Sequence, residues 1–163
     1  MQPDSYDETL IRQLHDQMIM AWNHGSGAAF AHPFRDDADF VAFDGTHLKG
    51  RKEIEIFHTE LLETELRGSR LEGGVHFVRY IHSDLAVMWA WAAMALPGQT
   101  HASASRDSMQ MFIVTKRDGE WAFEAMLNAR RVTMEQQDFS DQFESLSAPA
   151  QRQVTRKVAA MRH

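Results

Sequence analysis

The chain of 163 residues contains no cysteine, only four prolines and only two tyrosines. The absence of cysteine excludes disulfides, thiolate metal ligands and a thiol nucleophile, and it fits a reducing compartment. The longest uninterrupted apolar run, Leu85–Leu96, has 12 residues, whereas a membrane-spanning helix needs about 20. The N-terminal stretch is acidic and lacks the apolar segment of a signal peptide. We therefore expect a cytoplasmic protein without membrane contact.

Several motifs that hold cofactors or nucleophiles are also missing. The sequence has no GxGxxG loop, no P-loop, no GxSxG elbow and no HExxH helix, and its nine histidines are scattered. We expect neither a cofactor nor a metal. The net charge of −6 argues against a nucleic-acid partner, which would require a clustered positive surface.

Hydrophobic periodicity predicts an α+β protein. Apolar residues such as Leu10, Leu14 and Met18 recur at helical spacing and predict a helix over 5–23. The complete set of expected elements is helices over 5–23, 28–34 and after Gly50, a short strand over 39–43, and strands over 70–81, 85–96, 105–115 and 120–130. This order predicts helices packed on one face of a curved antiparallel sheet.

The strand predicted over 85–96 is apolar on both faces. Leu85, Val87, Trp89 and Trp91 alternate with alanines and methionines, whereas a half-exposed antiparallel strand should alternate apolar with polar residues. Helices can cover only one face of the sheet, so we expect the other apolar face to lie in a homodimer interface. The alternative is that the chain's own C-terminal helices cover it.

A set of short motifs resembles a known family. These motifs are Ala21-Trp22-Asn23-His24-Gly25, Phe34-Arg35-Asp36-Asp37-Ala38-Asp39-Phe40, Gly45-Thr46-His47-Leu48-Lys49-Gly50-Arg51, Ser105-Arg106-Asp107-Ser108, Asp118-Gly119-Glu120-Trp121 and Asn128-Ala129-Arg130. Over residues 5–132 the chain is similar to the SgcJ/EcaC family of the SnoaL-like, nuclear-transport-factor-like superfamily. The resemblance implies a cystatin-like cone of sheet wrapped by three helices, usually dimeric, with an apolar pocket inside. We expect this domain over residues 1–132 and a helical extension over 133–163.

The same resemblance argues against one known chemistry of the superfamily. Steroid-isomerase-like members need a carboxylate base, a tyrosine and a second acid in the cone. The matching positions here are occupied by Ala42, Met18 and Met111. Because apolar side chains neither carry a proton nor stabilise an enolate, isomerase chemistry of that type is not expected.

Two histidines are candidates for a site. His58 lies on the apolar stripe of the third helix, where it could act as a general base or bind a ligand carbonyl. The alternative is a core histidine bonded to a backbone carbonyl. His47 follows the Asp44-Gly45 turn, at the expected mouth of the pocket, where Asp44 or Asp39 could orient it. Its alternative is a turn residue in water.

The remaining candidates lie on strands and on the first helix. The resemblance places Trp89 and Trp91 inside the cone, where Trp22 and Met111 would complete an aromatic wall for a flat apolar ligand; plain core packing is the alternative. Glu124 and Asn128 share a mixed face of the last strand and could orient that ligand. Glu124 would then need a partner such as His58 or Arg106; otherwise it faces solvent.

Three functions follow as hypotheses. The first is a homodimeric protein that binds a small apolar molecule. The second is an enzyme of the isomerase, cyclase or hydratase type that uses His58. The third is an association domain without a ligand.

Overall fold

The computed structural model describes residues 5–102 and 107–131. The predicted extension over 133–163 lies outside the described residues. No helix within the described ranges is long and apolar enough to cross a membrane.

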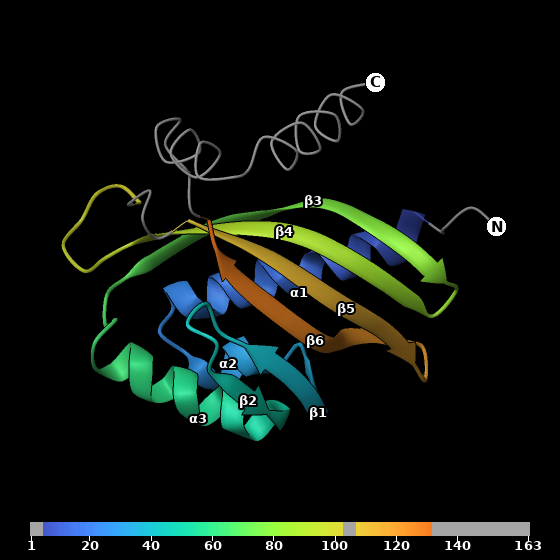
Figure 1. Ribbon diagram of the computed structural model, residues 1–163, viewed down its shortest axis with the longest axis horizontal. Coiled ribbons are helices and arrows are strands. Elements are labelled where there is room, and N and C mark those ends of the chain that lie inside the picture. Colours follow the sequence, from blue (N-terminus) through green and yellow to red (C-terminus); the bar gives the residue numbers. More distant parts are fainter. Residues whose placement is uncertain (1–4, 103–106, 132–163) are drawn as a thin grey trace, which may run out of the picture. The chain divides into compact units, whose positions relative to one another are not determined.

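The described elements follow the predicted order, with one additional strand, β2, before the third helix (Figure 1). The helices are α1 (Ser5–Asn23), α2 (Gly27–Ala31) and α3 (Gly50–Glu63). The strands are β1 (Phe34–Val41), β2 (His47–Lys49), β3 (Arg70–His82), β4 (Leu85–Ala95), β5 (Ser108–Arg117) and β6 (Glu120–Arg130). The α+β class is confirmed, and so are the bounds predicted for α1 and β6.

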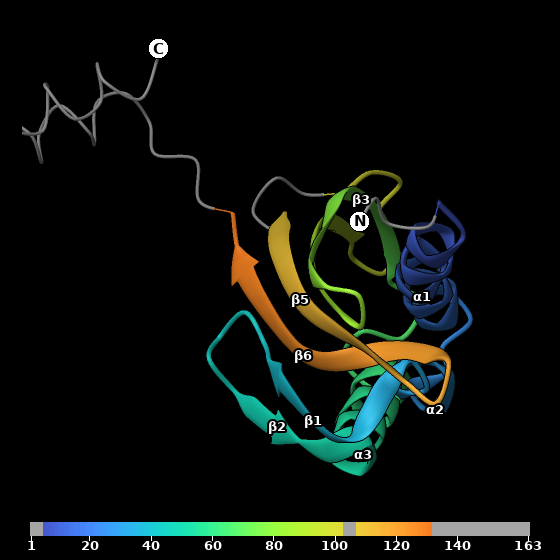
Figure 2. The ribbon, with the colours of Figure 1, turned by 90° about the vertical axis from the view of Figure 1, so that its right-hand side faces the viewer.

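All six strands form one sheet in the order β2-β1-β6-β5-β4-β3. Strands β3 to β6 pair as an antiparallel meander. Strand β1 instead runs parallel to β6, with Phe34 opposite Phe123, so the sheet is mixed rather than antiparallel throughout. The curved sheet has α1, α2 and α3 on one side (Figure 2). We call this side the inner face and the opposite side the outer face.

The largest departures from prediction are around β1. The strand begins at Phe34, five residues before the predicted start, and α2 ends at Ala31 rather than at Phe34. Charged residues at 35–37 break the alternation, and β1 is held by pairing with β6, which is distant in sequence. The three-residue strand β2, which pairs with the end of β1, was not predicted.

The two faces of β4 have different surroundings. Ala86, Met88, Ala90 and Ala92 are buried on the inner face, whereas Trp89 is half-buried and Trp91 is exposed on the outer face. Small inner residues allow close packing against α1. At Gly73 of the neighbouring β3, an added Cβ would lie 2.9 Å from Ile19 Cδ1 of α1, so only glycine fits there without a shift.

A β-bulge interrupts the alternation of β6. Val114 of β5 pairs with Phe123, and Ile113 pairs with Ala125, so Glu124 is an extra residue in the ladder. Phe123 and Met126 are therefore both buried, although they are three residues apart. The bulge changes which side chains of β6 face inward.

Candidate functional site

A cavity of about 480 Å³ lies between the helices and the inner face of the sheet. Most of its wall is apolar or aromatic, a composition typical of small-molecule sites, whose volumes run from about 300 to 1,000 Å³. The apolar lining consists of Met18, Trp22, Phe30, Phe40, Ala42, Phe43, Phe57, Leu61, Leu66, Leu71, Ala92, Met94 and Met126. Inside, the neutral polar groups are few: His58, Ser108, Gln110 and Asn128.

The exposed residues of the lining mark the opening of the cavity. Asp44, Glu60 and Glu65 are exposed carboxylates there, and Arg130 is an exposed cation. The guanidinium of Arg130 lies 4.8 Å from the ring centre of Phe43. The lining also includes Asp107, a half-buried carboxylate next to Ser108. The rest of the interior is apolar with neutral polar groups.

His58 is enclosed by aromatic rings. Its imidazole stacks on Phe30 with ring centres 4.0 Å apart, and Phe40 and Phe57 approach it edge-on. Its Nδ1 lies 2.8 Å from the carbonyl oxygen of Ile54, one helical turn earlier. Burial lowers the pKa of His58 to about 4, despite the opposing effect of this hydrogen bond. The imidazole is therefore neutral near pH 7, with its proton on Nδ1 and a lone pair on Nε2.

His58 has features of both alternatives that the sequence left open, a core histidine and a residue of a binding site. It is 3% exposed and bonded to a backbone carbonyl, as a core histidine would be. It also lines the cavity. Helix α2 packs closely on α3 next to His58. Gly27 allows this close approach, because a Cβ at that position would overlap the backbone nitrogen of Thr59.

Trp22 lies in the cavity wall, as predicted. Its Nε1 donates a hydrogen bond of 3.0 Å to Ser69 Oγ, so the indole nitrogen is used within the protein. Met18 and Ala42, the positions that the sequence resemblance assigned to a tyrosine and a carboxylate base, also line the cavity. The interior therefore lacks both groups at those positions.

A buried polar pair that sequence reasoning missed lies at the sheet side of the cavity. Gln110 is 4% exposed, lines the cavity, and its Oε1 lies 3.0 Å from His15 Nε2. Burial lowers the pKa of His15, so its neutral ring donates from Nε2 to this amide oxygen. The signal in the sequence is that Gln110 is the one polar residue between Met109 and Val114.

Asn128 lies directly opposite Gln110 on β6 and also lines the cavity, as predicted. Its Oδ1 is buried and has no hydrogen-bond partner in the described structure. An unpaired buried acceptor costs about 1–3 kcal/mol, and a donor that entered the cavity could recover part of that cost.

The aromatic wall predicted from Trp89, Trp91 and Met111 is not in this cavity. Trp89 pairs directly with Met111 on the outer face, and Trp91 lies over Gly74 of the next strand, where an added Cβ would come within 3.1 Å of the indole Nε1. Both faces of β4 are apolar, so alternation alone could not show which one the helices cover. The prediction that these three residues face the interior with Trp22 is wrong.

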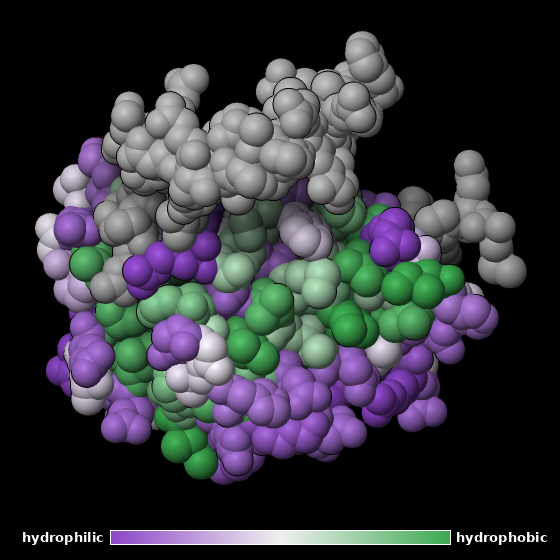
Figure 3. Space-filling model, viewed as in Figure 1, coloured by the Kyte–Doolittle hydropathy of each residue, from purple (hydrophilic) through white to green (hydrophobic). Residues whose placement is uncertain are grey.

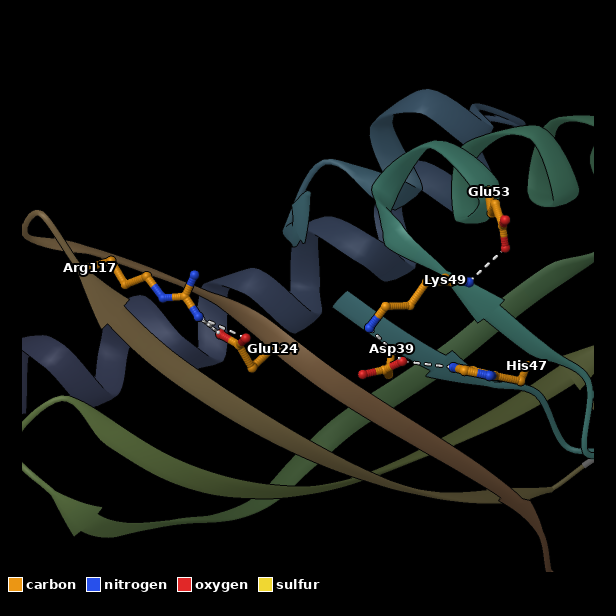
Figure 4. A network of polar contacts seen from close by, with 6 residues as sticks. All are labelled: Asp39, His47, Lys49, Glu53, Arg117 and Glu124. Carbon is orange, nitrogen blue, oxygen red and sulfur yellow. Dashed lines mark hydrogen bonds and ion pairs between the residues drawn. The ribbon is translucent and has the colours of Figure 1, made fainter. Parts of the chain in front are cut away.

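His47 and Glu124 are also outside the cavity lining, and each is in an ion pair, His47 at the β1–β2 edge of the sheet and Glu124 on the interior strand β6 (Figure 4). His47 Nε2 lies 2.8 Å from Asp39 Oδ1, so Asp39 rather than Asp44 orients it. Lys49 and then His47 hold the pKa of Asp39 below its usual range. Glu124 binds Arg117 at 2.7 Å, and the bulge turns it away from the interior. The prediction that Glu124 faces the ligand together with Asn128 is therefore wrong.

Metal ligation finds little support in the arrangement of side chains. Across residues 5–102 and 107–131, no three His, Asp or Glu side chains come together in a group that could hold an ion.

Comparison with solved structures shows the family of the chain. No family model matches the chain, and neither does any curated protein. Among solved structures, a domain of unknown function with a cystatin-like fold from Nostoc punctiforme is 54% identical, covers 98% of each chain and superposes with a TM-score of 0.80. The chain belongs to the family of this Nostoc domain. Its fold is therefore cystatin-like.

More distant structures agree on the fold alone. An NTF-2-like protein of unknown function from Shewanella oneidensis is 16% identical, with a TM-score of 0.61, over 74% of this chain and 97% of its own. A type 2 hexachlorocyclohexane dehydrochlorinase is 13% identical, with a TM-score of 0.63, over 76% of this chain and 84% of its own. The cystatin-like fold thus occurs in an enzyme and in proteins of unknown function.

Proposed function

We propose that this cystatin-like protein binds a small, largely apolar molecule in the cavity between its helices and its sheet. The observation that carries the proposal is an open cavity of about 480 Å³ with an apolar and aromatic wall. Only a few neutral polar groups interrupt that wall, which is the composition expected where apolar contact supplies affinity and polar atoms fix orientation.

The proposal is tested by filling the cavity. Ala92 is 2% exposed and lines the cavity, so Ala92→Phe should occupy part of the volume. The matched control is Ala28→Phe, at an exposed position of α2. Native mass spectrometry of the purified full chain should find a co-purifying small molecule in the wild type and the control but not in Ala92→Phe.

A binding assay with added ligand completes the test. Calorimetric titration with indole should show at least tenfold weaker binding to Ala92→Phe than to Ala28→Phe, because the added ring occupies space that the ligand needs. Two results would instead favour the hypothesis of an association domain without a ligand. One is equal binding of indole by the two variants. The other is that no preparation contains a co-purifying molecule and none binds indole.

We further propose that the protein is a homodimer that pairs through the outer face. An apolar patch there combines Phe77 of β3, Val87, Trp89 and Trp91 of β4, Met109, Met111 and Ile113 of β5, and Ala125 and Leu127 of β6, which are neighbours in the strand ladder. Apolar side chains form a band across this face, and hydrophilic residues border it (Figure 3). Exposed patches of this kind mark interaction sites.

A second copy of the chain suits this patch better than a charged partner. The centre of the patch carries no charge, and the border has both signs, in the Asp39–Lys49 and Glu124–Arg117 pairs. Phe77 and Trp89 stack with an interplanar angle of 10°, which flattens the surface. Two such faces can pack about 10 Å apart without opposing like charges.

The dimer is tested by charging the patch. Leu127→Lys, at a position 46% exposed, should convert the dimer to monomer in size-exclusion chromatography with light scattering. Ile56→Lys on α3, 56% exposed, is the control and should leave the dimer intact. A wild type that is monomeric at every concentration would refute the proposal. If truncation after Val132 then produced dimers, residues 133–163 would be the occupant of the patch.

His58 in the cavity keeps the enzymatic alternative open to experiment. Its Nδ1 is oriented by a backbone carbonyl and not by a carboxylate, and its pKa of about 4 makes it a weak base. Both properties favour binding over proton transfer. Loss of a measured turnover in His58→Gln, with ligand affinity retained, would support the enzyme instead. Within the cystatin-like fold, we also keep membership of the SgcJ/EcaC family as a proposal.

A further inference from the structure

The polar groups of the cavity select for the chemistry of the ligand. The proton of His58 is on Nδ1, where Ile54 O accepts it at 2.8 Å. Nε2 is consequently a lone-pair acceptor, and no group in the described part of the chain donates a hydrogen bond to it. Because four aromatic side chains surround the ring, a proton on Nε2 would be poorly solvated, and the nitrogen remains an acceptor at neutral pH.

Gln110 and Asn128 extend this polar set on the sheet side. His15 Nε2 donates to Gln110 Oε1 at 3.0 Å, which leaves the amide nitrogen of Gln110, with two hydrogens, as a donor for the cavity. Asn128 Oδ1, on the neighbouring strand, is buried without a partner. These groups therefore supply two acceptors, His58 Nε2 and Asn128 Oδ1, and the amide hydrogens of Gln110 and Asn128 as donors. The hydroxyl of Ser108, also in the lining, donates to the carbonyl oxygen of Ala92.

Among the described residues that line the cavity, none carries a positive charge inside it. The basic residue of that lining is Arg130, which is exposed at the opening and packs over Phe43. A carboxylate or phosphate near His58 would face two lone-pair acceptors without a counter-ion, and burying an unpaired charge is costly. Anionic ligands are consequently disfavoured.

We infer that the ligand is an uncharged molecule with an apolar ring system and a hydroxyl or N–H group that donates a hydrogen bond to His58 Nε2. This inference rests on the proposed function, since it assigns the chemical class of the molecule in that cavity. Gln110 then serves a second polar atom of the ligand that accepts. His15, which does not itself line the cavity, is a positioning residue because it holds the Gln110 amide in one orientation.

The test compares pairs of probes in which a methyl group replaces the donated hydrogen. Three pairs are titrated calorimetrically into the full chain: indole with N-methylindole, phenol with anisole, and cyclohexanol with methoxycyclohexane. The member with the donor should bind about tenfold more tightly in at least one pair, since the methylated member leaves the buried acceptor unpaired. Benzoate, the anionic probe, should bind more weakly than phenol.

Two variants then locate the effect. His58→Phe keeps an aromatic ring but removes the acceptor, so the preference for the donor should fall to about onefold while the methylated probes bind as before. His58→Gln retains an acceptor oxygen and should keep part of the preference. The unchanged affinity of the methylated probes also verifies that the variants are folded.

The outcomes separate this inference from the proposed function. If both members of every pair bind equally well to the wild type, or if the preference persists in His58→Phe, the inference is wrong and the cavity remains a binding site. If benzoate binds best, the ligand is anionic and the inference is also wrong. If no probe binds at millimolar concentration, the proposed function and the inference both fail.

Discussion

Acidification should weaken the fold through His58. Burial among aromatic rings lowers the pKa of His58 to about 4 from an ordinary value of 6.5. Between pH 6.5 and about 4, His58 is protonated in the unfolded chain but neutral in the folded chain. The contribution of neutral His58 to the free energy of unfolding is therefore complete above pH 6.5 and is lost as the pH falls towards 4. At a pH of about 5, the two pKa values correspond to a loss of about 2 kcal/mol in the free energy of unfolding.

The measurement is urea unfolding between a pH of about 7.5 and about 5. His58→Phe should lose about 2 kcal/mol less than the wild type over this range, because phenylalanine binds no proton. Other groups with lowered pKa values, such as His15 and Asp7, are present in both proteins, and their effects cancel in the difference. His76→Phe, at an exposed position of β3, is the matched control and should follow the wild type.

One result would refute this reasoning. If the wild type and His58→Phe lost the same stability on acidification, the imidazole would accept its second proton as readily in the folded chain as in the unfolded one. Its surroundings would then be wet or polar, and the description of an apolar aromatic enclosure around Nε2 would have to be abandoned.

Three further substitutions test separate contacts through the free energy of unfolding. Gly27→Ala should cost about 1–3 kcal/mol, because the new methyl group overlaps the backbone of Thr59; an unchanged midpoint in urea would show that the two helices can separate freely. Gln110→Leu should cost about 2 kcal/mol, because it leaves the buried Nε2–H of His15 without an acceptor. A double-mutant cycle with His15→Phe should give a coupling energy of at least about 1 kcal/mol. Additive effects would contradict the pairing of the two side chains. Trp121→Phe should cost about 1.5–3 kcal/mol, because it removes the 2.9 Å hydrogen bond that Trp121 Nε1 donates to Asp7 Oδ1 on α1. A loss below about 0.5 kcal/mol would mean that this hydrogen bond adds no stability beyond the bonds to water that it replaces.

Local patterns predicted the elements whose stability is local. The spacing of Leu10, Leu14 and Met18 fixed α1, and the turn at Asp118-Gly119 fixed the hairpin between β5 and β6. Strand β1 was only half predicted, because Phe34 is held in it by Phe123, 89 positions later in the chain. A pairing of that range leaves no trace in a local window of sequence.

The candidate site was predicted less well, for two physical reasons. The bulge at Glu124 inserts one residue into β6 and reverses the facing of the side chains before it relative to those after it. Period-two reasoning therefore placed Glu124 inside together with Asn128. The second reason is that both faces of β4 are apolar, so alternation does not orient Trp89 and Trp91. The size of the side chains does carry the signal, since alanines occupy the face on which a helix packs closely.

The contrast in size across β4 also bears on why a cavity exists at all. On the inner face of this strand, Ala92 lines the cavity, whereas Ala86, Met88 and Ala90 are buried outside its lining. The outer face has Trp89 and Trp91. Larger inner side chains would fill space and gain apolar contact, each buried methylene contributing about 0.8 kcal/mol. A hollow of about 480 Å³ around a neutral histidine and a buried amide forgoes that gain. Stability alone would favour a larger side chain than Ala92 in this wall, whereas the proposed binding of a small molecule needs the space that Ala92 leaves open.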